Sequence, residues 1–379
     1  MSSKIITLNN GRNMPVLGLG TYKSSPGQVH RAIIDAIDAG YRHFDCAWFY
    51  GNEAEIGGAL KEAIGTGKVK REELFITSKL WNNFHKKDKV VPMLKETLSY
   101  LKLEYIDLYL IHWPFAFKEN GALWPISEGA EAYSDIDYLE TWEGMEECVN
   151  QGYAKSIGIS NFNSEQIERL LKNCKIKPVV NQVEVNPNCN QKKLIQFCKD
   201  REIIITGYCP LGRVGEAVIR GFPPPTVLDP KVVEIAKKHN KTPVQVVLNY
   251  LISLGITVIP KSVTKSRIVE NINVFDFKLD VEDITYLDSC NNNSRKRMGH
   301  GFGELYKLRN IIQYRLSPFE QRAFAKAFSH GLPNVIRRTK DSVLYVVPPF
   351  VIGYLVYDQV EKLHLKYMRK NPADYADEK

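Results

Sequence analysis

Eight short β-like runs recur along the first 290 residues, and stretches with apolar side chains at a 3.6-residue spacing separate them. Residues 29–39 and 88–101 are two of these helical stretches. The alternation of eight strands with helices predicts a (β/α)8 TIM barrel. The predicted strands cover residues 17–20, 42–45, 74–78, 106–111, 156–160, 179–184, 203–208 and 257–260.

An N-terminal β-hairpin is expected ahead of this barrel. Asn10-Gly11 is a hairpin turn signal, and β-like runs at residues 5–8 and 16–19 flank it. On pattern alone, a doubly wound parallel sheet is the alternative to a barrel, but it needs a glycine-rich fingerprint after the first strand. The segment G-L-G-T-Y-K at 18–23 has only two glycines, so that signal is weak.

The cysteine pattern, the N-terminal sequence and the charge distribution limit the classes of protein that this sequence could encode. The seven cysteines include no C-x-x-C pair, which predicts reduced thiols and neither a disulfide framework nor a metal site. The start, M-S-S-K-I-I-T-L, has neither signal-peptide nor transit-peptide character. From Met298 onward 13 Lys and Arg face 8 Asp and Glu, so the tail carries most of the net charge of +8. We expect no nucleic-acid partner.

Four residues at or near the ends of predicted strands offer acid catalysis. They are Asp45, Tyr50, Lys79 and His112. The unperturbed pKa of tyrosine is about 10, and a lysine ammonium beside the phenol would stabilise the phenolate and lower that pKa. An aspartate would hold the ammonium in place, and a histidine could orient the group that receives the proton. Asp45 on its own is equally a helix cap or a salt-bridge partner.

The segments that hold these residues resemble the aldo-keto reductase family over about residues 4–290. They are F-D-C-A-W-F-Y-G (44–51), T-S-K-L-W (77–81), L-I-H-W-P (110–114) and I-P-K-S-V-T-K-S-R-I-V-E-N (259–271). The resemblance implies an NADPH-dependent carbonyl reductase with a monomeric, cytoplasmic barrel. It implies that Tyr50 is the general acid, that Lys79 lowers its pKa, that Asp45 anchors Lys79 and that His112 orients the carbonyl.

The same resemblance implies an NADP(H) site. For the nicotinamide, it implies hydrogen bonds to the carboxamide from Ser160, Asn161 and Gln182 and stacking of the Tyr208 ring. For the rest of the cofactor, it implies a clamp on the 2′-phosphate from Lys261, Ser262 and Arg267 and adenine contacts from Glu270 and Asn271. Further cofactor contacts are expected from Thr21, Tyr22 and Leu211. Taken alone, K-S-V-T-K-S-R is also compatible with a solvated basic turn.

The substrate pocket is expected to contain Tyr22, Trp81, His112 and Trp113. Three departures from the family concern this pocket. Tyr22 stands where many members carry tryptophan, and Cys209 stands where serine is usual. The specificity loop that should follow residue 290 is cut short, which leaves the closure of the pocket open.

Residues 298–379 resemble a second family, subunit 8 of the cytochrome b-c1 complex. The similar segments are L-S-P-F-E-Q-R-A-F (316–324), G-L-P-N-V-I-R-R (331–338), V-V-P-P-F-V-I-G-Y-L-V-Y (346–357) and R-K-N-P-A-D-Y (369–375). The predicted organisation is therefore a barrel at 1–290, a linker at 291–297 and a helical tail at 298–379. The capping box at S-P-F-E predicts a helix from Ser317 to near Gly331.

One candidate transmembrane helix lies in the tail. The uncharged run at 342–357 reaches only ~24 Å, short of a ~30 Å hydrocarbon core, so a buried or interfacial helix is equally compatible. The resemblance favours a single pass through the mitochondrial inner membrane, among complex III subunits. A gene fusion, or two neighbouring reading frames merged at Met298, would explain the two resemblances. A structural accessory subunit and a cofactor-binding sensor are the alternatives to a reductase.

Overall fold

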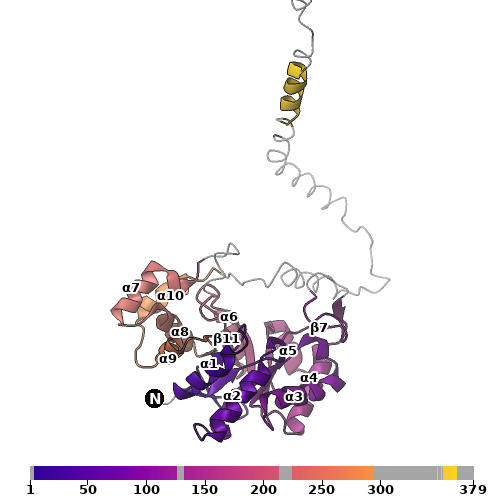
Figure 1. Ribbon diagram of the computed structural model, residues 1–379, viewed down its shortest axis with the longest axis vertical. Helices are drawn as coiled ribbons and strands as arrows, with labels where there is room; N and C mark the ends of the chain where they lie inside the picture. The colour runs from indigo at the N-terminus through magenta and orange to yellow at the C-terminus, as the bar shows by residue number, and fades with distance from the viewer. Residues whose placement is uncertain are drawn as a thin grey trace, which may run out of the picture. The chain divides into compact units, whose positions relative to one another are not determined.

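The computed structural model describes residues 4–125, 132–212, 224–292, 348, 351 and 353–364 (Figure 1). The chain divides into two compact units, Met1–Leu305 and Tyr306–Lys379. The first unit holds all the strands of the described chain and all its labelled helices, and the second unit contains the helical residues 353–364. The predicted linker lies mostly outside the described residues, as does the predicted helix from Ser317.

Eight parallel strands form one sheet in the order β12-β11-β10-β9-β6-β5-β4-β3. Parallel bridges between Leu17 and Val258 and between Gly20 and Lys261 join the two edges, so the sheet closes on itself. The predicted barrel is thereby confirmed. The strands are β3 (Leu19–Gly20), β4 (His43–Asp45), β5 (Phe75–Leu80), β6 (Leu108–Ile111), β9 (Ile157–Ser160), β10 (Val180–Glu184), β11 (Ile204–Tyr208) and β12 (Thr257–Val258).

Helices with an apolar face pack around the sheet, and their local sequences explain where they start. Thr242 caps α8 with Gln245 in a capping box, and Asp280 caps α10 in the same way. The helices are α1 (Gln28–Asp38), α2 (Glu53–Gly65), α3 (Lys87–Leu101), α4 (Tyr138–Asn150), α5 (Ser164–Leu171), α6 (Lys192–Lys199), α7 (Pro230–Lys238), α8 (Pro243–Ser253), α9 (Lys265–Ile272) and α10 (Val281–Ser289). Short 3-10 turns are η1 (Trp48–Tyr50), η2 (Arg71–Glu73), η3 (Asn82–Phe84) and η5 (Thr226–Leu228).

The predicted hairpin is present, with its second strand earlier than expected. β1 (Ile5–Thr7) pairs antiparallel with β2 (Asn13–Pro15), not with residues 16–19. Gly11 has φ +80°, which a residue with a Cβ adopts only at a cost. Leu8 and Met14 pack against Phe75, Leu108, Leu110, Val179 and Val180 in one buried cluster. Because several of these lie at strand starts, the hairpin covers the N-terminal end of the barrel.

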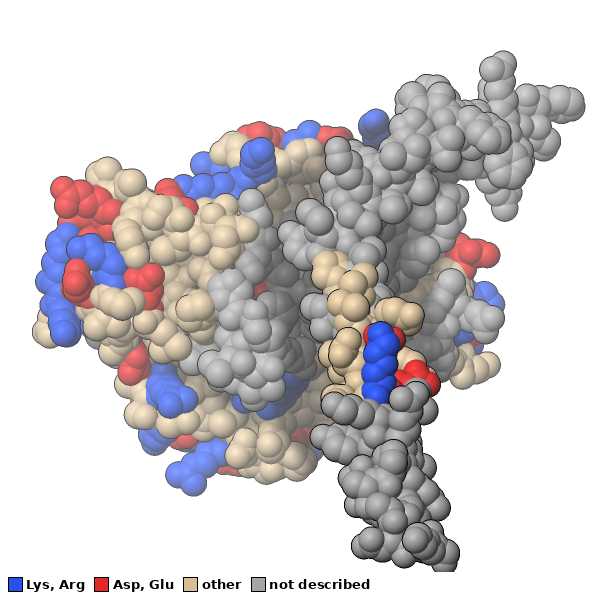
Figure 2. Space-filling view, turned by 90° about the horizontal axis from the view of Figure 1, so that it is seen from above, with Lys and Arg blue, Asp and Glu red and all other residues tan. Residues whose placement is uncertain are grey.

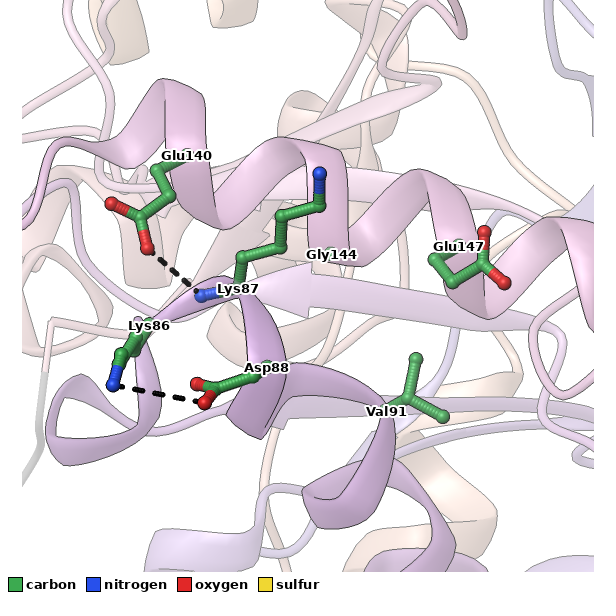
Figure 3. A pocket seen from close by; sticks show the side chains of 7 residues that line it. All are labelled: Lys86, Lys87, Asp88, Val91, Glu140, Gly144 and Glu147. Carbon is green, nitrogen blue, oxygen red and sulfur yellow. Dashed lines mark hydrogen bonds and ion pairs between the residues drawn. The ribbon is translucent and has the colours of Figure 1, made fainter.

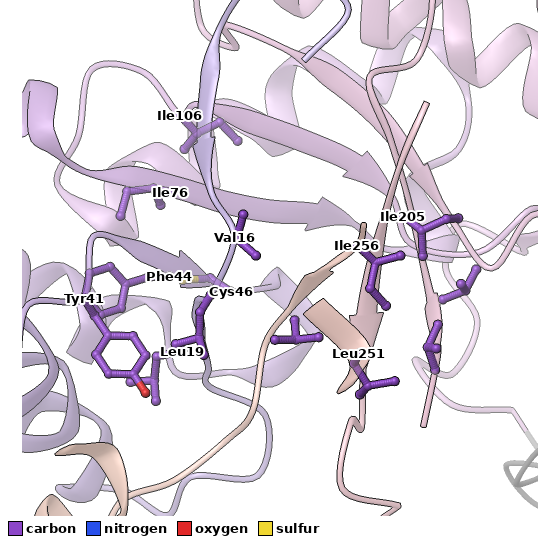
Figure 4. Close-up of a cluster of buried hydrophobic side chains, with 14 of the residues drawn as sticks. Val16, Leu19, Tyr41, Phe44, Cys46, Ile76, Ile106, Ile205, Leu251 and Ile256 are labelled. Carbon is purple, nitrogen blue, oxygen red and sulfur yellow. The ribbon is translucent and has the colours of Figure 1, made fainter. Parts of the chain in front are cut away.

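The main core is a continuous cluster of buried apolar side chains between the sheet and the helices. Figure 4 shows part of it, including Phe44 and Ile76 on neighbouring strands and Leu251 on α8. The burial of this surface is the main force that holds the barrel together. On the face shown in Figure 2, Lys and Arg lie interspersed with Asp and Glu over the described surface.

A second antiparallel pair, β7 (Ala116–Phe117) and β8 (Tyr133–Ser134), was not predicted. It is a short excursion after β6, and two-residue strands leave almost no periodic signal. In the second unit, residues 353–364 are helical, and their large apolar side chains are exposed, including Tyr354, Val356 and Tyr357. Among the described residues, no helix meets the length and hydropathy needed to cross a membrane.

Candidate active site

A buried ion pair and a phenol meet at the C-terminal end of the barrel strands. Lys79 Nζ lies 2.9 Å and 2.8 Å from the two carboxylate oxygens of Asp45 and donates to the Cys46 carbonyl at 2.8 Å. It also donates to the Tyr50 hydroxyl at 3.3 Å. Lys79 is 1% exposed. Three of the four predicted catalytic residues therefore form one hydrogen-bonded cluster.

The chain around Tyr50 is fixed by local hydrogen bonds. After β4, residues Trp48–Tyr50 make one 3-10 turn, and Gly51 with φ +68° turns the chain into α2. Asn52 Nδ2 donates to the Thr21 carbonyl at 3.0 Å, and Thr21 Oγ1 donates to the Asp45 carbonyl at 2.9 Å. These bonds tie the tyrosine-bearing turn to β3 and β4, so the phenol is held beside Lys79.

Glu53, the first residue of α2, is a buried carboxyl group beneath this turn. Ser78 Oγ donates to its Oε1 at 2.5 Å. Burial raises the pKa of Glu53 to about 7, although the hydrogen bond from Ser78 acts in the opposite direction. The residue anchors α2 to β5, and sequence analysis did not assign it a role.

The pKa of the Tyr50 phenol is raised well above its ordinary value. Burial is the largest cause, and the nearby Asp45 carboxylate adds to it. The net shift of this pKa is therefore upward, and the expected lowering by Lys79 stays a prediction. The phenol keeps its proton at neutral pH, and the ammonium at 3.3 Å can stabilise the phenolate once it forms.

His112 directly follows β6 and is held by its main chain, whose N–H donates to the Leu80 carbonyl at 3.1 Å. Burial and the Lys79 charge lower the pKa of the imidazole well below its usual value, so the ring is neutral. Among the described residues Nδ1 has no hydrogen-bond partner. The ring lies edge-on to Trp81, with 5.0 Å between centroids, and 5.9 Å from the Tyr50 ring.

A cavity of about 690 Å³ connects these residues with the predicted cofactor residues. Lys79 lies behind its wall, whereas every other predicted site residue lines it. These are Thr21, Tyr22, Asp45, Tyr50, Trp81, His112, Trp113, Ser160, Asn161, Gln182, Tyr208, Leu211, Lys261, Ser262, Arg267, Glu270 and Asn271. Residues from all eight barrel strands or the loops that follow them meet here, as the barrel fold requires.

Sequence analysis missed several lining residues. Phe49 stacks on Trp81 with centroids 3.7 Å apart, and Trp124 lies 5.8 Å from Trp81 on the same side. Together they form an aromatic wall near His112. Lys23 also lines the cavity, and its carbonyl accepts a hydrogen bond from Lys261 Nζ at 3.2 Å. Phe49 could have been found from the sequence, because it directly precedes the predicted catalytic Tyr50 and therefore shares its loop.

The polar end and the basic end of the cavity differ in structure. Asn161 Nδ2 donates to the His112 carbonyl at 3.0 Å, and its Oδ1 accepts from the Tyr208 hydroxyl at 2.9 Å. At the other end, Lys261 and Arg267 flank the start of α9, and Ser262 Oγ accepts from the Thr264 N–H at 3.1 Å. Burial lowers the pKa of Lys261, which an anion nearby would offset.

A separate hollow of about 490 Å³ lies between α3 and α4 (Figure 3). Its charged groups are satisfied among themselves and their neighbours. Lys86 pairs with Asp88 at 3.7 Å, and the Lys87 N–H donates to Glu140 at 3.2 Å. None of the predicted site residues lines this hollow, so the larger cavity is the candidate active site.

Comparisons with known proteins match two segments of the chain. The model of the aldo/keto reductase family matches residues 16–292, and that of the UcrQ family matches residues 301–376. Aldo-keto reductase family 1 member A1-A of Danio rerio is 49% identical over 292 residues, which are 76% of this chain and 90% of the relative. The member A1 of Bos taurus is 46% identical over 297 residues, 78% of this chain and 91% of the relative.

Solved structures agree with these matches. A Bombyx mori aldo-keto reductase in complex with NADP has a TM-score of 0.72 and 43% identity, covering 78% of this chain and 95% of that one. The aldose reductase from Schistosoma japonicum has a TM-score of 0.74 and 41% identity, covering 84% of this chain and 100% of that one. Both predicted resemblances are thereby confirmed, and the chain belongs to the aldo/keto reductase family.

Proposed function

We propose that the barrel is an NADP-dependent reductase that converts aldehydes and ketones to alcohols, with Tyr50 as the general acid. The observation that carries this proposal is the Asp45–Lys79–Tyr50 cluster, which faces a cavity of about 690 Å³ that also contains His112. A small carbonyl compound is the substrate, and the barrel acts as a monomer. NADPH, when bound, supplies the hydride for the carbonyl carbon.

The residues of the chain supply positioning and the proton. Neutral His112 is available to hold the carbonyl oxygen near Tyr50. As negative charge develops on that oxygen, the Tyr50 O–H bond breaks and the proton moves to the oxygen, which completes the alcohol. The Lys79 ammonium, 3.3 Å away, stabilises the resulting phenolate until solvent reprotonates it. Asp45 keeps the ammonium in place.

The proposed cofactor site runs along the cavity. Ser160, Asn161 and Gln182 hold the carboxamide and Tyr208 stacks on the nicotinamide, while Thr21, Tyr22 and Leu211 add contacts. Lys261, Ser262 and Arg267 bind the 2′-phosphate, and Glu270 and Asn271 contact the adenine. The basic end supports this assignment, because two cations and a helix start suit a phosphate dianion. Tyr22, Trp81, His112 and Trp113 form the substrate pocket, with Phe49 and Trp124 beside them.

A Tyr50→Phe variant tests the acid assignment. We expect its kcat for an aromatic aldehyde to fall about 10²- to 10⁴-fold, since the proton donor is lost. The NADPH Kd should stay within about threefold, because the ring is retained. Tyr41→Phe is the matched control: this tyrosine is buried, donates to the Ile268 carbonyl at 3.1 Å and does not line the cavity. A Tyr50→Phe enzyme with kcat within threefold of wild type would exclude Tyr50 as the acid.

Residues 298–379 support a second proposed function, a single-pass accessory subunit of the mitochondrial cytochrome b-c1 complex (complex III), in the inner membrane. The UcrQ match at 301–376 and the exposed apolar side chains of residues 353–364 favour it. The proposed boundaries are a barrel at 1–290 and a linker at 291–297. A message that reads through Arg295 to Met298, with a 43.3 kDa product, would establish a genuine fusion. Two separate messages would show that two reading frames were merged.

A further inference from the structure

Gln182 makes a hydrogen bond across the interior of the barrel. Its Nε2 donates to Asp45 Oδ1 at 2.7 Å, although the two residues are 137 positions apart in sequence. Gln182 lies on β10 and Asp45 on β4, and these strands are not neighbours in the sheet. The bond therefore joins two sides of the site directly, without passing along the sheet.

This bond reaches the group that holds the catalytic lysine. Asp45 Oδ1 accepts from both Lys79 Nζ at 2.9 Å and Gln182 Nε2, while Oδ2 accepts from Lys79 at 2.8 Å. All three residues are at most 2% exposed. In such surroundings a hydrogen bond to a carboxylate is strong. Loss of the Gln182 donor would therefore change the strength of the hydrogen bonds between Asp45 and Lys79.

Gln182 is also the centre of the polar end of the cavity. Its main-chain carbonyl accepts from Ser160 Oγ at 2.8 Å and from the Asn161 N–H at 2.9 Å. An ionised carboxylate only accepts hydrogen bonds, so the NH₂ group of the Gln182 amide is the one that faces Asp45. The amide oxygen Oε1 is then the atom of this side chain that remains for a donor in the cavity.

We propose that Gln182 is a positioning residue that couples nicotinamide binding to the proton-donating cluster of Asp45, Lys79 and Tyr50. A donor from the cofactor carboxamide polarises the amide at Oε1 and strengthens its bond to Asp45 at Nε2. By reciprocity, a change at Asp45 alters the affinity for the cofactor. The inference rests on the proposed function, because it assumes that the cavity holds NADP(H).

The test is a double-mutant cycle on NADP⁺ binding, which needs no turnover. The Kd is measured by quenching of tryptophan fluorescence for wild type, Asp45→Asn, Gln182→Met and the double variant. We expect Asp45→Asn to weaken binding about fivefold or more in the wild-type background and less than about twofold once Gln182 is methionine. Any direct contact of Asp45 with the cofactor contributes equally in both backgrounds and cancels.

Thr206→Val provides the matched control. Thr206 is the register partner of Gln182 on β11, it does not line the cavity, and its hydroxyl shares a hydrogen bond with Thr257 Oγ1 at 2.7 Å. Asp45→Asn should therefore weaken binding equally with and without this change. At saturating NADPH, Gln182→Met should lower kcat about tenfold, whereas Thr206→Val should change it less than twofold. This kcat comparison also decides the question if Asp45→Asn does not fold.

The failure of the coupling and the failure of the proposed function give different results. If the effect of Asp45→Asn is the same in the wild-type and Gln182→Met backgrounds, or if kcat is unchanged in Gln182→Met, the coupling is refuted while NADP⁺ binding stands. If wild type binds no NADP⁺, the proposed function itself fails.

Discussion

Lys79 and Lys68 each lie 2.8 Å from an aspartate, but the two pairs differ in burial. The side chains of Lys79 and Asp45 are 1% and 3% exposed, whereas those of Lys68 and Asp38 are 40% and 42% exposed. Removing one partner of a buried pair leaves a charge away from water and costs about 3–5 kcal/mol. Breaking an exposed pair costs less than about 1 kcal/mol, because water and salt screen it.

We therefore expect Lys79→Met to lower the free energy of unfolding by about 3–5 kcal/mol and Lys68→Met to lower it by less than about 1 kcal/mol. Urea unfolding followed by tryptophan fluorescence measures both. All five tryptophans lie between residues 48 and 142, so the signal reports the barrel. Equal losses in the two variants would contradict the assigned burial of the Lys79–Asp45 pair.

The pKa shifts at the site predict how the reaction depends on pH. Reduction needs Tyr50 protonated, and its pKa is raised, so the acid form persists at least to the ordinary phenol value of about 10. The pKa of His112 is lowered, so its ring stays neutral below pH 6.5. The kcat/KM for aldehyde reduction should therefore show no inflection from His112 near 6.5 and no alkaline fall below about pH 9.

Glu53 lies beside the site and titrates inside this window, because burial raises its pKa to about 7. Any step in kcat/KM near pH 7 should therefore disappear in Glu53→Gln, which cannot ionise. If wild type and Glu53→Gln both show an alkaline inflection well below pH 9, the pKa of Tyr50 is lowered, as the sequence led us to expect.

Sequence analysis predicted which residues line the candidate site, but it did not predict the direction of the pKa shift of Tyr50. The strand-end positions of Asp45, Tyr50 and His112 follow from the barrel pattern and the motifs, and these residues line one cavity. The sign of the Tyr50 shift could not be predicted, because pairing Lys79 with the phenol ignores the cost of burying a phenolate. The Gln182–Asp45 bond was equally hidden, since nothing in the sequence joins residues 137 positions apart.

At the scale of elements, the eight predicted strands are all present, and errors concern their ends. β5 continues to Leu80, so Lys79 lies within the strand and not just beyond it. The predicted end at Ser78 followed the apolar run, but strand pairing with β6 continues through Lys79 and Leu80. The end of β5 is thus set by main-chain hydrogen bonding and not by the change from apolar to polar side chains at Lys79.

Two glycines of α2 occupy opposite surroundings, which gives an element-scale prediction. A Cβ on Gly57 would lie 2.1 Å from the Tyr100 carbonyl oxygen on α3, whereas one on Gly65 would meet nothing within 4 Å. Gly57→Ala should therefore force the helices apart and cost about 1–3 kcal/mol. Gly65→Ala should stabilise by about 0.4–1 kcal/mol, because it reduces the freedom of the unfolded chain.

Urea unfolding of the two variants measures these effects, and each serves as the control for the other. A Gly57→Ala barrel as stable as wild type would show that α2 and α3 do not pack as closely as described. The sequence contains Gly57-Gly58 as a pair and could not indicate which of them faces the neighbouring helix.

At the scale of the whole chain, the barrel carries its own core. The buried apolar side chains of the main cluster lie between Val16 and Leu287. α10 completes this core with Leu287 and with Asp288, whose Oδ1 accepts from the Tyr250 hydroxyl at 2.6 Å. These residues fall within the segment 16–292 that matches the aldo/keto reductase family, before the UcrQ match begins at 301.

A chain that ends at residue 292 should therefore unfold at the same urea concentration as the full chain and bind NADP⁺ with a Kd within about twofold. A chain that ends at residue 279 is the matched control, and it should be destabilised because it lacks α10. The full chain alone should bind lipid vesicles, since its residues 353–364 expose Tyr354, Val356 and Tyr357. Vesicle binding by the chain that ends at 292 would place the membrane-active surface on the barrel, and weakened NADP⁺ binding by that chain would show that the cofactor site depends on the tail.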